Sequence, residues 1–255
     1  MNYTEEELEE AKAYLKDRLR NQRSMEKDIE NLLAIYAAYL LSALFSKASD
    51  EDIQTLINSL VEQLLSDCET LAVDTHDRKD AIIAYMTGER NGDTLEGRIR
   101  KRAETFFNEV FAVYLAGTLL GKGQEVLLKS IKESLKRPWE NEVLEEAREK
   151  QANGEISNEY DFVEPHYGRG NATSSLLAIE RALSYAVADA WTYWQWLDKI
   201  DGGAVGYYVL RGSSFPCDLC DSHTGIFFDV NDKDSLPPYH TNCVCFAVYT
   251  KVPRL

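Results

Sequence analysis

Towards the end of the 255-residue chain the sequence reads FPCDLCDSHTGIFFDVNDKDSLPPYHTNCVCFAVYTK, residues 215–251. Cys217 and Cys220 are separated by two residues, and His240, Cys243 and Cys245 follow after a gap of nineteen. A structural zinc site takes four tetrahedral nitrogen or sulfur donors, and two donors spaced by two residues fit one edge of that tetrahedron. Cys243 and Cys245 lie two apart, so on a strand both side chains point to the same face. The spacing predicts a small β structure that a metal ion holds together.

Five candidate ligands compete for four places, before His223 is counted, and the sequence leaves open which four bind. Four of the five cysteines fall in the last forty residues. In a reducing compartment such a cluster favours a metal site, whereas oxidising surroundings favour disulfides, and small buried cysteines on a tight hairpin are a further alternative. A catalytic zinc needs an open coordination position and a general base, and no glutamate is spaced for that role. We therefore expect a structural zinc.

The segments around the motif carry the signals of short strands. The runs YYVLR (207–211), GIFFDV (225–230) and CFAVYTK (245–251) are rich in β-branched and aromatic residues and lie between turn signals. Pro237 and Pro238 favour an extended turn before His240. These patterns predict three short strands around the two ligand groups.

Upstream, the apolar residues recur at helical spacing through the first two hundred positions. We expect helices over about 4–20, 24–45, 49–72, 74–87, 94–120 and 172–200, with two shorter helices on either side of Pro138. The predicted fold class is mostly α, a multi-helix body with a small C-terminal β-hairpin and zinc-knuckle subdomain (α+β). A polar stretch with three glycines, residues 151–171, predicts a linker or long loop between a helical body, 1–150, and a C-terminal region, 172–255.

The composition limits the classes of function. A net charge of -15 disfavours strong direct binding to nucleic acid, because phosphate contacts need lysine and arginine. The longest apolar run, 32–45, is shorter than the roughly 20 residues of a membrane span, and acidic residues precede it, so we expect no membrane association and no signal peptide. No phosphate loop, HExxH, GxSxG or GxGxxG motif occurs. The sequence suggests no catalytic residue, and we expect the protein not to be an enzyme.

Several isolated residues have simpler interpretations than a functional site. The aromatic set at Trp191, Tyr193, Trp194 and Trp196 favours helix packing over an exposed partner surface. Cys68, His76 and His166 stand alone and are expected to be structural or surface residues. His223 is expected to be a loop histidine outside the metal site.

The C-terminal motif resembles the signature of phage head morphogenesis proteins of the MuF type. In that family a CxxC precedes a glycine-bearing hairpin and a closing Pro-Pro-x-His-x-Asn-Cys-x-Cys. The matching positions here are Cys217, Cys220, Gly225, Pro237, Pro238, His240, Asn242, Cys243 and Cys245. The family's closing segment commonly reads His-Pro-Asn-Cys-Arg-Cys, and this chain has Thr241 and Val244 at the variable places. The resemblance covers about fifty residues and leaves the candidate ligands intact.

The resemblance implies a minor capsid protein that acts in head morphogenesis. Such a protein contacts the portal or other capsid proteins, resides in the virion head, and is made in the host cytoplasm. A first alternative is a MuF-type trafficking module of a toxin, although the ten residues after Cys245 leave no room in this sequence for a C-terminal toxin domain. A second alternative is a zinc-dependent protein that binds nucleic acid, against which the net charge weighs.

Overall fold

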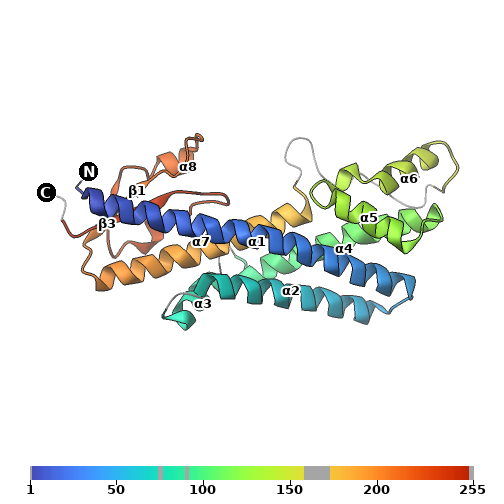
Figure 1. Ribbon diagram of the computed structural model, residues 1–255, viewed down its shortest axis with the longest axis horizontal. Helices are drawn as coiled ribbons and strands as arrows, with labels where there is room; N and C mark the ends of the chain where they lie inside the picture. The colour runs from blue at the N-terminus through green and yellow to red at the C-terminus, as the bar shows by residue number, and fades with distance from the viewer. Residues whose placement is uncertain (1, 74–76, 90–91, 158–172, 253–255) are drawn as a thin grey trace. The chain divides into compact units, whose positions relative to one another are not determined.

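The computed structural model describes residues 2–73, 77–89, 92–157 and 173–252. Within them lie eight α-helices and a three-stranded antiparallel sheet near the C-terminus, so the predicted mostly α fold with a small β subdomain is confirmed (Figure 1). The helices are α1 (Glu5–Phe45), α2 (Asp50–Val73), α3 (Lys79–Thr87), α4 (Leu95–Leu119), α5 (Gln124–Ser134), α6 (Glu142–Ala152), α7 (Ser175–Asp201) and α8 (Asp218–Asp221). A 3-10 turn, Pro138–Glu140, separates α5 from α6 as the proline predicts.

The first helix corrects the sequence analysis. Two helices were expected before Phe45, with a break near Ser24, but α1 runs without interruption for 41 residues. The predicted break was wrong because residues 20–25 include neither proline nor glycine to end the preceding helix. At the start of α1, Thr4 and Glu7 form a capping box, since each backbone N–H donates to the other side chain.

The chain divides into two compact units, each assembled from segments that are distant in sequence. The first combines 1–25, 66–95 and 181–255, and the second combines 26–65 and 96–180. Much of the stretch interpreted as a linker lies outside the described residues, and α6 ends at Ala152. The division into 1–150, 151–171 and 172–255 stays a prediction.

The sheet of the first unit has its earliest strand in the middle. Strand β1 (Gly206–Leu210) pairs antiparallel with β2 (Phe227–Asp229) on one side and with β3 (Phe246–Thr250) on the other. The three predicted strands are therefore present, but β2 and β3 do not form a hairpin with each other. Instead, β1 lies between them, and the two groups of candidate ligands lie in the connections from β1 to β2 and from β2 to β3.

The two faces of the sheet bury different partners, because alternate side chains point to opposite sides. One face packs against the N-terminal part of α1, where Ala11 contacts Phe246 and Val248. The other face packs against the cysteine-rich segments, through the side chains of Tyr207, Val209, Ala247 and Tyr249. The sheet is thus covered by a helix on one side and by the candidate metal ligands on the other.

Helix α7 supplies the aromatic packing of the first unit. The Trp191 Nε1 donates to the Leu71 carbonyl at 3.1 Å, and the Trp196 Nε1 donates to the Val230 carbonyl at 2.7 Å. Trp194 stacks on Tyr14 with ring centroids 5.6 Å apart. The structure confirms that this aromatic set is used for packing within the protein.

The described residues of the second unit form helices joined by turns, with no strand among them. Asn141 caps α6 by accepting from Val143 and Leu144 backbone N–H groups. Gly117 lets α4 and α5 approach closely, because a Cβ there would lie 2.2 Å from Leu127 Cδ2.

Among the described helices, α1 alone is long and apolar enough to cross a membrane, judged by length and composition. The core helix of a soluble protein passes the same test. In α1, 39% of the most apolar 18-residue stretch is buried within the protein.

Candidate metal centre

The first ligand group lies where the chain leaves β1 and enters the short helix α8. Cys217 precedes α8 and Cys220 lies within it, and the Asp221 backbone N–H donates to the Cys217 carbonyl at 2.8 Å. This single helical turn places both sulfurs on one side of the backbone. Arg211 braces the turn by pairing with Asp221.

The second ligand group lies in a tight turn that leads into β3. The Cys243 backbone N–H donates to the His240 carbonyl at 3.0 Å, and Asn242 adopts a positive φ of 68° within that turn. Asparagine tolerates this left-handed conformation better than most residues. The turn brings His240 and Cys243 each close to Cys220, and Cys245 lies directly before β3.

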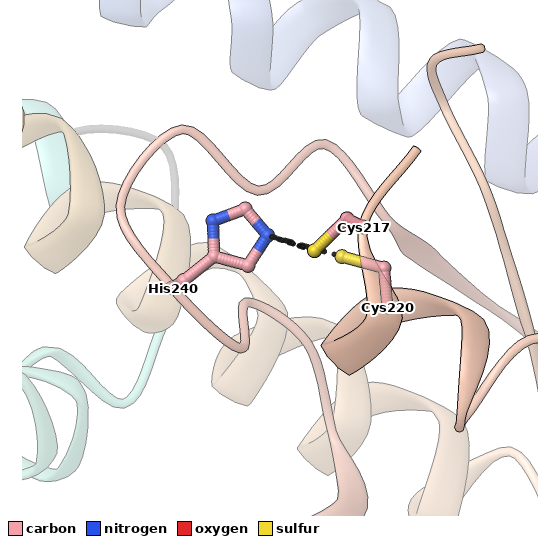
Figure 2. A group of neighbouring side chains, drawn as sticks. All are labelled: Cys217, Cys220 and His240. Atoms are coloured by element: carbon pink, nitrogen blue, oxygen red, sulfur yellow. Dashed lines mark hydrogen bonds between the residues drawn. The ribbon is translucent and has the colours of Figure 1, made fainter. Parts of the chain in front are cut away.

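The fold brings all five predicted ligands together. Figure 2 shows the His240 ring directed at the sulfurs of Cys217 and Cys220. The Nε2 atom lies 3.3 Å from Cys217 Sγ and 3.1 Å from Cys220 Sγ. Cys220 also belongs to a second group of three with Cys243 and Cys245, and in each group the ligand atoms lie within 4.8 Å of one another.

The distances around Cys220 are close to the edges of a tetrahedral metal site. With zinc–sulfur bonds of about 2.3 Å, two sulfurs on one tetrahedron are separated by roughly 3.8 Å. Cys220 Sγ and Cys243 Sγ are 3.8 Å apart. All five cysteines of the chain are free thiols, so the cluster is not cross-linked by a disulfide. The cluster has the donor types and spacing to hold a metal ion.

The histidine is oriented by a second contact. Its Nδ1–H donates to the Thr241 carbonyl at 2.7 Å, which leaves Nε2 as the ring atom that faces the sulfurs. Metal-binding histidines usually make such a bond with the ring nitrogen that does not bind the metal, because it fixes the tautomer and the ring orientation. His240 therefore has the arrangement of a ligand prepared in advance.

Hydrogen bonds distribute negative charge unevenly over the cluster. The Cys220 backbone N–H lowers the pKa of Cys217, whereas burial, followed by the Cys217 side chain, raises the pKa of Cys220 to about 12. The side chain of Cys245 lowers the pKa of Cys243 to about 5, and the same contact, with burial, raises the pKa of Cys245. A backbone N–H group thus favours the thiolate form of Cys217, and the Cys245 side chain favours that of Cys243.

Burial opposes the charged form of His240, but nearby groups outweigh it. The Thr241 carbonyl and the sulfurs of Cys243 and Cys217 together raise the pKa of His240. The surroundings of the ring are therefore negative, as expected of a site that attracts a cation.

The remaining candidates from the sequence lie elsewhere. His223 is in neither metal-ligand group, because its Nδ1 contacts Leu219 and Ser222 and its ring stacks on Tyr239. Cys68 is fully buried, with its sulfur 3.8 Å from Met86 Sδ, and burial raises its pKa to about 12. His76 and His166 lie outside the described residues.

Sequence reasoning missed one residue beside the cluster. Arg18 is 2% exposed, and its Nη2 donates to the Cys245 carbonyl at 3.4 Å. The available signal was its position, seven residues after Ala11 and seven before Met25, both of which are buried. That spacing places Arg18 on the inward face of α1.

Comparison with protein-family models, with curated proteins and with solved structures gives no match for this chain.

Gly212 provides a test of how closely the centre depends on its backbone. A Cβ at Gly212 would lie 2.1 Å from the carbonyl oxygen of Val244, the residue between Cys243 and Cys245. We expect Gly212→Ala to displace that backbone and to lower the free energy of unfolding by about 1–3 kcal/mol, as overpacking does. Urea denaturation measures this change.

Gly202→Ala is the matched control, because its Cβ would make only ordinary contacts of 3.4 and 3.5 Å. Its free energy of unfolding should stay within about 0.5 kcal/mol of the parent value, as for most surface substitutions. Equal effects of the two substitutions would show that the Val244 backbone has room to move.

Proposed function

We propose that this chain is a minor head protein of a tailed phage, of the MuF type, whose C-terminal segment is fastened by one structural zinc ion. The observation that carries the proposal is that Cys217, Cys220 and His240 form one close group, and that Cys220 joins this group to Cys243 and Cys245. These residues occupy the ligand-type positions of the motif that resembles the MuF signature.

Zinc is the metal that the donor set favours. Three thiolates and an imidazole suit zinc, a borderline-soft ion without a geometric preference of its own, whereas calcium and magnesium prefer oxygen ligands. The proposed ligands are Cys217, Cys220, His240 and Cys243. Cys243 is chosen over Cys245 because its sulfur lies at the tetrahedral edge distance from Cys220, 3.8 Å.

The role proposed for the zinc is structural. Cys220 and Cys243 are 4% and 6% exposed, and four protein ligands leave no position for a substrate. The metal would hold the segment between β1 and β3 in one shape. The helices would then supply the surface that meets the portal or other capsid proteins inside the head, and no catalytic step is assigned to the chain.

The rival functions have weaker support. A nucleic-acid-binding protein needs a basic surface, and the net charge of -15 opposes one. A toxin-linked trafficking module remains a candidate because the same motif type occurs in such proteins, and a toxicity assay on expression in bacteria separates it from a head component.

The metal content tests the proposed centre. Protein purified under reducing conditions without added metal should contain about one zinc per chain by elemental analysis. Cys217→Ser, Cys220→Ser and Cys243→Ser should each lose most of this zinc, whereas Cys245→Ser should retain it.

Cys68→Ser is the control for the loss of a buried thiol outside the centre, since Cys68 is fully buried in the same compact unit. It should keep the zinc of the parent protein. A folded, reduced parent protein with no zinc would refute the metal centre, and loss of zinc from Cys245→Ser instead of Cys243→Ser would reassign the fourth ligand.

The head assignment is tested by quantitative mass spectrometry of purified particles and proheads of the source phage. The chain should be present in both at a copy number far below that of the major capsid protein. Its absence from both, with soluble chain present in infected cells, would contradict a structural role in the head and favour an effector.

A further inference from the structure

Arg18 is a buried cation beside the proposed metal centre. It lies on α1 within the same compact unit as the cysteine cluster, and its side chain is the largest of those that are almost fully excluded from solvent. The guanidinium remains charged in proteins, because its pKa lies far above physiological pH. A positive charge is therefore held in the interior of this unit.

The hydrogen bonds of Arg18 are long and incomplete. The Nη1 atom donates to Thr192 Oγ1 and the Nη2 atom donates to the Cys245 carbonyl, each at 3.4 Å. The Nε atom is buried without a hydrogen-bond partner. Among the ion pairs of the described residues, none includes Arg18, so no carboxylate neutralises it there. Burying an unpaired charge is strongly unfavourable.

Arg18 is linked to the cluster by its hydrogen bond to the carbonyl of Cys245, two residues after Cys243. Burial lowers the pKa of Arg18, and Tyr14, Cys243 and Cys245 oppose that shift electrostatically. A metal ion binds cysteine as the thiolate, so loading the centre would place negative charge near Arg18.

We infer that Arg18 is the countercharge of the metal centre and selects an anionic zinc–thiolate site, an inference that rests on the zinc site proposed above. Three thiolates, a neutral imidazole and Zn²⁺ carry a net charge of about -1. The guanidinium balances this charge across the Cys245 backbone. Arg18 does not bind the metal, and its role is to stabilise the loaded centre from outside the ligand shell.

This role differs from simple packing in its dependence on metal. If Arg18 serves only to fill space, its replacement changes the stability of the metal-free and zinc-loaded protein equally. If it neutralises the loaded centre, its replacement weakens the zinc-loaded form, while the metal-free form loses an unfavourable buried charge. The two possibilities are separated by measuring both forms.

The experiment compares the parent protein with Arg18→Met, Arg18→Gln and Arg18→Lys. Arg20→Met is the control on the same helix, because the Arg20 side chain is 69% exposed and pairs with Asp17 at the surface. Zinc affinity is measured by competition with a chromogenic chelator, and urea unfolding is measured with zinc and with excess chelator.

Arg18→Met and Arg18→Gln should weaken zinc binding about 10–100-fold, the usual effect of losing an outer-shell partner. Neither should destabilise the metal-free protein as much as the zinc-loaded protein. Arg18→Lys should retain most of the affinity because it keeps the charge, and Arg20→Met should match the parent.

Unchanged zinc affinity in Arg18→Gln, or an equal loss of stability with and without zinc, would overturn the inference. Comparing Arg18→Gln with Arg18→Lys keeps the test decisive where Arg18→Met does not fold, since these two differ chiefly in charge. A parent protein without measurable zinc affinity would overturn the metal site itself, and this failure is visible before any variant is made.

Discussion

The C-terminal sheet is too small to be stable by itself, and the rest of the first unit is organised around that constraint. Its strands have five, three and five residues, and a sheet of this size buries too little apolar surface to fold alone. The N-terminal part of α1 covers one face of the sheet, where Ala11 packs against Val248. The cysteine-rich segments cover the other face, so both covers are needed to hold the strands.

The second cover is made of segments with little regular structure. Between β1 and β3 the chain forms only a four-residue helix, a three-residue strand and a 3-10 turn. The backbone hydrogen bonds of this path belong mostly to local turns, and a metal ion with four ligands would fix its two ends at one point. The proposed zinc and the countercharge from Arg18 would together tie this path to α1, so that helix, sheet and knuckle form one cooperative unit.

The sequence predicts the elements of this protein better than their connections. Helical spacing and the strand-like runs place α7 and all three strands close to their observed ranges, because apolar periodicity directly reports which face is buried. The sequence does not show that β1 lies between β2 and β3, since strand order depends on contacts distant along the chain. The predicted break in α1 near Ser24 was wrong because no helix-ending residue lies beside it. The five metal candidates were found because ligand spacing is local, whereas Arg18 was missed because its significance arises only when α1 meets the knuckle.

The central claim is that three of the cysteines and His240 bind one zinc ion. X-ray absorption at the zinc edge of the purified protein tests it most directly, because the first shell reports the number and type of ligand atoms. We expect three sulfurs at about 2.3 Å and one nitrogen at about 2.0–2.1 Å. A shell of nitrogen and oxygen alone, or of four sulfurs, would contradict it.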